Sequence, residues 1–195
     1  GLVGSEMCIR DRVRSWRKEW NQGEFPFYYV QIAPYDYGRK NADKTEAAEI
    51  RQVQLECLKE IPNAGMVVTA DIGNRTCVHP SDKESVGKRL ALWALAKTYQ
   101  RSGTPYSGPL YKSFTIDKEK IIVEFDYAEM GMTSYDREIV GFEIAGKDGI
   151  YYPAKAVLFD NKTKVMLTSD QVPEPVGVKL SLIHISEPTR PLYIS

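Results

Sequence analysis

The chain has two histidines, His79 and His184, and imidazole is the side chain best suited to move a proton near neutral pH. His79 stands in "VHPSDKESVGKRLALWALAKTY" (78–99), after an apolar segment and before an amphipathic one. Pro80 favours extended backbone at His79. We therefore expect the imidazole on a loop beyond a strand, where open α/β sheets bind ligands. Position alone favours a structural or surface role for a single loop histidine.

The second histidine lies in a segment that has a counterpart at the other end of the chain. "LSLIHISEPTR" (180–190) can be encoded by DNA whose reverse complement, read in another frame, encodes "LVGSEMCIRDR" (2–12). The two ends of one protein have no functional reason to be antisense copies. We therefore expect residues 1–12 and 180–195 to be translated sequencing adapter and not native sequence. His79 is then the only native histidine.

Composition argues against several kinds of function. The chain has 26 Lys and Arg residues against 26 Asp and Glu residues, so there is no electrostatic case for a nucleic acid partner. Outside the two flanks, Cys57 and Cys77 are too few for a disulfide framework or a cysteine zinc site. His79 has no surrounding Cys, His and Asp cluster, which argues against a metal site. No apolar run is long enough to span a bilayer.

Strand and helix patterns alternate in residues 13–101. "FPFYYVQIA" (25–33) is typical of a strand buried on both faces. Apolar residues at helical spacing, followed by proline and glycine, predict a helix over 44–60. "GMVVTADIG" (65–73) predicts a second buried strand, and a further helix opens at Ser81 with the spacing of a capping box. This order predicts a parallel sheet with flanking helices.

A different pattern fills residues 102–179, after a linker rich in Gly, Pro and Ser (101–109). Short strand signals are separated by turn signals such as "DKEK", "GKDG" and "DNKT". The strand signals are "YKSFTI", "KIIVEFDY", "GFEIAG", "YYPAKAVLF" and "KVMLTS". The spacing predicts an antiparallel β-sandwich.

Four blocks in order, "WRKEWNQGEFPFYYVQIAPY", "PNAGMVVTADIG", "VHPSDKESVGKRLALWALAKTY" and "SGPLYKS", resemble the C-terminal half of sialate O-acetylesterases. These are SGNH-type serine esterases of carbohydrates. The resemblance implies the C-terminal part of a three-layer α/β/α domain in residues 13–101 and an accessory β-domain in 102–179. It also implies an acetylated sugar substrate, an acyl-enzyme, no metal or organic cofactor, and a periplasmic or secreted location.

The family's "HP" histidine is the general base of its Ser-His-acid arrangement, and the matching residue is His79. SGNH esterases often carry an aspartate three residues before that histidine, but Thr76 stands there. Asp71, at the end of the second expected strand, is our candidate for orienting His79, and a turn-capping role for it is equally open. We expect Asp82 to be a first-turn carboxylate that favours the helix dipole.

The family's nucleophile lies in an upstream "GQSN"-like block that is absent here, so the chain alone is expected to be inactive. Ser81 is better explained as a helix N-cap than as a replacement. Gln31 is a candidate to face the sugar. Arg51 and Gln54, which match a family "R-x-x-Q" pattern, are candidates to brace the site, and all three suit structural roles equally well. A carbohydrate-binding β-module beside a degenerate hydrolase half is the alternative function.

Overall fold

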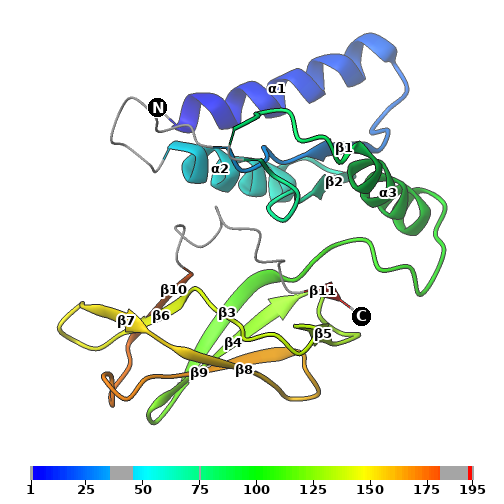
Figure 1. Cartoon of the computed structure of the whole chain (residues 1–195). Coiled ribbons are helices and arrows are strands. Elements are labelled where there is room, and N and C mark those ends of the chain that lie inside the picture. Colours follow the sequence, from blue (N-terminus) through cyan, green and yellow to red (C-terminus); the bar gives the residue numbers. More distant parts are fainter. Residues whose placement is uncertain (1, 36–45, 75, 181–192, 195) are drawn as a thin grey trace. The chain divides into compact units, whose positions relative to one another are not determined.

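The computed structural model describes residues 2–35, 46–74, 76–180 and 193–194 (Figure 1). The chain divides into two compact units, Gly1–Ser107 and Gly108–Ser195, and the division falls within the expected linker at 101–109. Most of the expected C-terminal flank lies outside the described residues. Among the described residues, no helix combines the length and apolar character needed to cross a membrane.

The described residues of the first unit form a parallel pair of strands and three α-helices. Its elements are α1 (Leu2–Trp20), β1 (Phe27–Val30), α2 (Glu46–Glu60), β2 (Ala64–Val67) and α3 (Lys83–Trp93), and α3 continues into a π-helical turn, η1 (Ala94–Thr98). β1 pairs in parallel with β2, from Phe27 opposite Ala64 to Val30 opposite Val67. The predicted parallel arrangement is confirmed.

Both strands are shorter than the apolar runs that predicted them, with four residues each. Beyond β2 the chain turns, and the Ile72 N–H donates to the Thr69 carbonyl at 3.2 Å. The backbone groups that would extend the ladder are therefore engaged in a turn. Asp71 consequently lies in this turn and not in the strand.

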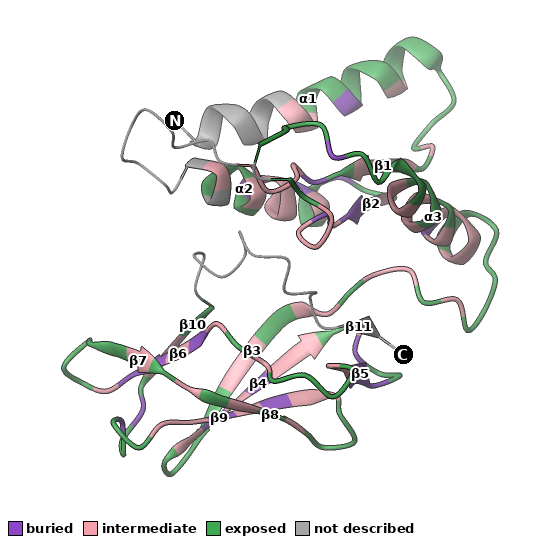
Figure 2. Ribbon diagram, viewed as in Figure 1, coloured by how far each residue is buried: buried purple, intermediate pink, exposed green. Residues whose placement is uncertain are grey.

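α1 and α2 lie side by side (Figure 1) and share a small apolar core. Val13 of α1 and Cys57 of α2 are almost fully buried within it (Figure 2). Ile9 packs against the same core, and Arg10 Nη1 donates to Glu60 Oε2 at 2.9 Å. α1 therefore continues through the expected boundary at residue 12 without a break. The adapter origin of residues 1–12 is a statement about the encoding DNA, and it stays a prediction.

The second unit is made of antiparallel strands. They are β3 (Leu110–Asp117), β4 (Lys120–Asp126), β5 (Met132–Thr133), β6 (Phe142–Ala145), β7 (Tyr151–Pro153), β8 (Lys155–Phe159), β9 (Lys164–Thr168), β10 (Gly177–Leu180) and β11 (Tyr193–Ile194). The sheets have the orders β3-β4-β9-β8, β10-β6-β7 and β11-β5. Ile121 of β4, Leu167 of β9 and Ile144 of β6 meet in one core, so the two larger sheets bury their apolar faces together. The predicted antiparallel half is confirmed.

Candidate active site

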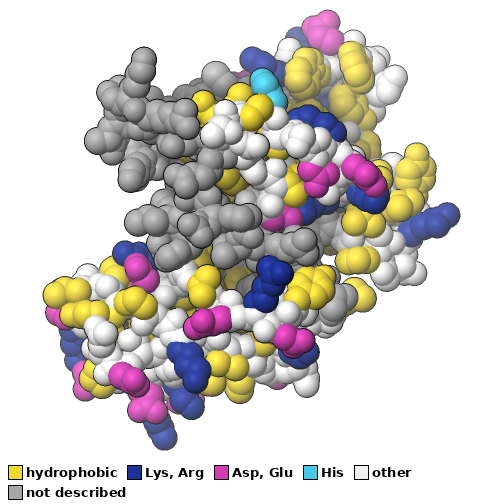
Figure 3. Space-filling view, in the orientation of Figure 1, with side chains coloured by type: hydrophobic (Ala, Val, Ile, Leu, Met, Phe, Trp, Pro, Cys, Tyr) yellow, Lys and Arg dark blue, Asp and Glu magenta, His cyan; other side chains and the backbone are white. Residues whose placement is uncertain are grey.

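His79 lies on the loop between β2 and α3, in the position that the sequence predicts. Its side chain is exposed, and Figure 3 shows the drawn histidine at the surface beside hydrophobic atoms. The residue that follows His79, Pro80, is buried. Within the described part of the chain, the hydrogen bond at His79 is one that its carbonyl accepts from Cys77 Sγ at 3.2 Å. The imidazole is thus open to a partner from outside this unit.

The loop that carries His79 is ordered by the side chain of Asn74. Asn74 Oδ1 accepts hydrogen bonds from Thr76 N at 2.8 Å, Thr76 Oγ1 at 2.9 Å and Cys77 N at 3.1 Å. The Asn74 N–H donates to the Pro34 carbonyl at 3.1 Å. At Gly73 a Cβ would lie 2.6 Å from that same carbonyl oxygen, so only glycine fits this approach. The loops that follow β1 and β2 are therefore joined.

Gln31 lies directly after β1 and is buried. Its backbone N–H donates to the Val67 carbonyl at 2.9 Å, and its side-chain Nε2 donates to the Arg51 carbonyl of α2 at 3.0 Å. Thr69, also buried, donates from Oγ1 to the Gln31 carbonyl at 2.9 Å. Because a buried amide without partners is costly, this arrangement favours a bracing role for Gln31 over contact with a sugar.

Gln54 of α2 also braces the strand end. Its Oε1 accepts from the Ile32 N–H at 3.0 Å, its Nε2 donates to the Val30 carbonyl at 3.5 Å, and its own carbonyl accepts from the Tyr29 hydroxyl at 2.5 Å. The Gln54 side chain therefore binds backbone groups at the end of β1 and just beyond it. Arg51 Nε donates to a carbonyl one turn earlier in α2 at 3.2 Å.

Asp71 forms an ion pair that was not predicted from the sequence. Its side chain is 3% exposed, and its partner is Arg89 of α3, 26% exposed. Arg89 Nη1 donates to Asp71 Oδ1 at 2.7 Å, and Arg89 Nη2 donates to Asp71 Oδ2. Arg89 Nη1 also donates to the Val68 carbonyl at 2.7 Å. A buried carboxylate needs a cation nearby. An aspartate just beyond an apolar strand is therefore the only sign in the sequence that a cation such as Arg89 lies beside it.

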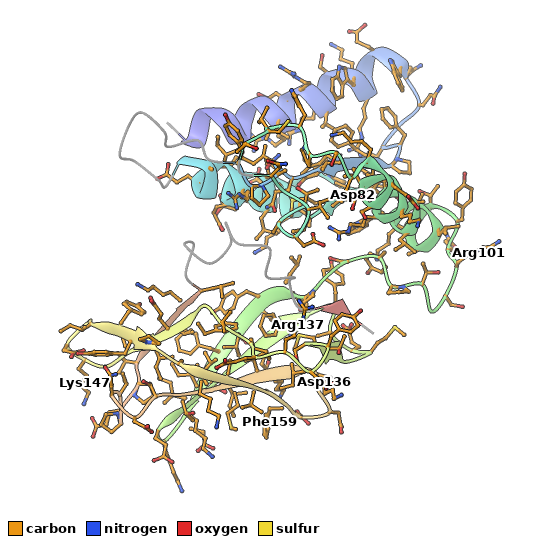
Figure 4. The ribbon with its side chains drawn as sticks, viewed as in Figure 1. Asp82, Arg101, Asp136, Arg137, Lys147 and Phe159 are labelled. Atoms are coloured by element: carbon orange, nitrogen blue, oxygen red, sulfur yellow. The ribbon has the colours of Figure 1, made fainter. Side chains whose placement is uncertain are left out.

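The N-cap of α3 is Asp82, and our assignment of that position to Ser81 is wrong by one residue (Figure 4). Asp82 accepts from Ser85 N at 2.9 Å and from Ser85 Oγ at 2.6 Å. The Ser85 hydroxyl and then the Ser85 N–H hold the pKa of Asp82 below its ordinary value. Ser81 instead forms a tight turn in which its carbonyl accepts from the Lys83 N–H at 2.8 Å. Asp and Ser are both good N-caps, so residue type could not decide between them.

In the described ranges, no group of three or more His, Cys, Asp and Glu side chains is placed to hold a metal ion. An open pocket of about 280 Å³ lies in the second unit, between the β6–β7 turn and the segment before β10. Lys147, labelled in Figure 4, and Glu174 line it and form an ion pair at 3.4 Å. None of the residues predicted for the site lines this pocket.

No family model matches the chain, but individual proteins do. Mouse sialate O-acetylesterase is 29% identical over 121 residues, which cover 53% of this chain and 22% of that protein. Human sialate O-acetylesterase is 28% identical over 131 residues, which cover 59% of this chain and 25% of that protein. This chain is similar in sequence to sialate O-acetylesterases. The match spans about a quarter of the length of these relatives.

A crystal structure extends the sialate O-acetylesterase resemblance to both units. A carbohydrate acetylesterase from Xanthomonas citri matches with a TM-score of 0.82 and 32% sequence identity. The match covers 99% of this chain and 44% of that protein. Both the mixed α/β unit and the antiparallel unit of this chain are therefore similar to parts of a solved acetylesterase.

Proposed function

We propose that the chain is the histidine-bearing part of a longer serine esterase that removes O-acetyl groups from sialic acid or a related acetylated sugar. The observation that carries the proposal is the exposed His79 on the loop after β2, in a chain 32% identical to a carbohydrate acetylesterase over 99% of its length. In this proposal residues 13–101 are the C-terminal part of an SGNH-type three-layer α/β/α domain. Residues 102–179 are an accessory β-sandwich, and residues 1–12 and 180–195 are not native.

The proposed chemistry uses His79 as a base and then as an acid. The imidazole takes the hydroxyl proton of a serine while the serine oxygen attacks the acetyl carbonyl, and it returns that proton to the departing sugar oxygen. Water then attacks the acetyl-serine by the same route and releases acetate. The serine belongs to a segment upstream of this chain, and the reaction needs no metal or organic cofactor.

The bracing contacts around the strand ends support this proposal. Gln31, Arg51 and Gln54 hold the chain beyond β1 against α2, and Asn74 ties the His79 loop to the segment beyond β1. A proton-transfer group must be held within a fraction of an ångström of its productive position. In our proposal these polar residues brace the wall of the site from within the fold.

The test uses the complete parent protein with the upstream segment restored, and measures acetate release from O-acetylated sialic acid and from acetylated xylan. Changing His79 to Ala should lower turnover by about three orders of magnitude or more, the usual scale for the loss of a triad member. Val78→Ala, an exposed neighbour on the same loop, is the matched control and should keep its activity. Equal rates for the parent and His79→Ala would refute the assignment.

Two further outcomes discriminate between the alternatives. The 195-residue chain alone should release no acetate above background, because it lacks the nucleophile, and clear activity would show that the serine lies within it. A parent protein that binds acetylated sugars without releasing acetate would instead favour the carbohydrate-binding module.

A further inference from the structure

The ion pair between Asp71 and Arg89 closes the loop that carries His79. Asp71 stands just before that loop, and Arg89 stands in α3 just after it. The guanidinium contacts both carboxylate oxygens of Asp71 and also the Val68 carbonyl. Arg89 thus holds the chain leaving β2 at two points, and it holds them to the helix that follows His79.

The loop has few other restraints near His79. The contacts of Asn74 order its first half, up to Cys77. Val78 and His79 are exposed, and the next restraints are the buried Pro80 and the start of α3. The separation between the end of β2 and α3 therefore affects where the imidazole lies. The ion pair fixes this separation next to the loop, and the bond from Trp93 to the Met66 carbonyl fixes it farther along α3.

Water cannot easily replace the guanidinium beside Asp71, because the carboxylate is buried. The Asp71 carboxylate is almost completely buried, and a buried carboxylate is costly unless a cation lies beside it. A planar guanidinium can contact two carboxylate oxygens at once, which a lysine ammonium cannot do with the same geometry. The charges of Arg89 and Asp71 also act on the Asp82 carboxylate, so the pair lies within electrostatic range of the helix N-cap.

We propose that Arg89 is a positioning residue for His79, and that Asp71 anchors the histidine loop through Arg89 instead of orienting the imidazole itself. This inference rests on the proposed role of His79 in ester hydrolysis. The guanidinium contacts both oxygens of Asp71, which is the geometry expected of an anchoring carboxylate.

The first test measures amide hydrogen exchange of residues 76–82 in the 195-residue chain. Arg89→Met should raise exchange in this segment by about tenfold or more, because the loop opens locally without its clamp, while exchange within α2 stays unchanged. Lys88→Met is the matched control, since Lys88 is the preceding residue of α3, pairs only with Glu84 among the ion pairs of the described residues, and is highly exposed. Unchanged exchange in Arg89→Met would overturn the proposal.

The second test separates positioning from general support of the fold. In the parent protein, Arg89→Lys should lower kcat by about tenfold to a hundredfold, the scale of a misplaced catalytic group, with KM changed much less. The imidazole resonances of His79 should shift in the same variant. Wild-type kcat together with unshifted His79 resonances in Arg89→Lys would overturn the proposal.

A further variant keeps the proposal testable if Arg89→Met does not fold. The double change Asp71→Asn with Arg89→Gln removes both charges and leaves two amides that can pair, so it should fold and show intermediate loop exchange. A parent protein that releases no acetate would refute the proposed function, whereas the exchange of residues 76–82 decides the role of Arg89 independently.

Discussion

Gly65 of β2 lies against the indole of Trp93, which makes it a sensitive test of how α3 packs on the strands. A Cβ at Gly65 would lie 2.4 Å from Trp93 Cε3, 2.6 Å from Trp93 Cδ2 and 2.8 Å from Tyr28 Cδ1. Trp93 is buried, and its Nε1 donates to the Met66 carbonyl at 3.0 Å. The buried indole is therefore also held by a hydrogen bond, and it cannot retreat freely from an added methyl group.

The expected cost of Gly65→Ala follows from these distances. Carbon atoms in ordinary contact are about 3.5–4.0 Å apart, so the rings must move by roughly 1 Å. Overpacking of this kind costs about 1–3 kcal/mol of unfolding free energy. Trp93→Leu alone should cost about 3 kcal/mol, because it removes buried ring atoms and one hydrogen bond. In the double variant the clash disappears, so its loss should be smaller than the sum by about 1 kcal/mol or more.

Denaturant unfolding followed by tryptophan fluorescence measures these free energies. The three tryptophans of the chain are Trp16, Trp20 and Trp93, so the signal reports the first unit, and two of them remain in Trp93→Leu. Gly87→Ala is the matched control, because a Cβ there meets nothing within 4 Å. It should stabilise α3 by about 0.5–1 kcal/mol. Additive losses at Gly65 and Trp93, or equal effects at Gly65 and Gly87, would refute the reasoning.

Three further measurements test local interactions of the same unit. The bonds from Ser85 lower the pKa of Asp82 below 3.8. The stabilisation of α3 by the Asp82 cap is therefore present above that pH and is lost as the pH falls below it. Asp82→Ala should lower the melting temperature at neutral pH and have little effect on it in strong acid. Burial raises the pKa of Tyr29 above its ordinary 10.0, so the folded state loses stability as the pH rises past that value. The melting temperature of Tyr29→Phe should therefore fall less steeply at alkaline pH. At neutral pH this variant should lose about 1 kcal/mol of unfolding free energy, because the hydroxyl no longer donates to the Gln54 carbonyl. Gly73→Ala should raise hydrogen exchange in the His79 loop, because it separates the two strand-end loops, and unchanged exchange would contradict that packing.

By itself the sequence determined the order β1, α2, β2 and α3, the parallel pairing of the first two strands and the antiparallel second half. It also placed His79 on a loop between a strand and a helix. These features depend on periodicity, turn residues and the local effect of Pro80, all of which act over a few neighbouring positions. The sequence did not predict α1, and the single strand signal "YYPAKAVLF" corresponds to two strands, β7 and β8. The four sequence blocks pointed to the same esterase family that the relatives bear out.

Only the tertiary structure decided how the polar side chains are used. Asp71 and Arg89 are 18 positions apart, and Gln31 and Arg51 are 20 apart, so no local pattern could pair them. The N-cap is Asp82 and not the predicted Ser81, because the turn at Ser81 sets where α3 begins. Residue types limit which hydrogen bonds and ion pairs can form, but the distances that select among them arise only when strands and helices pack together.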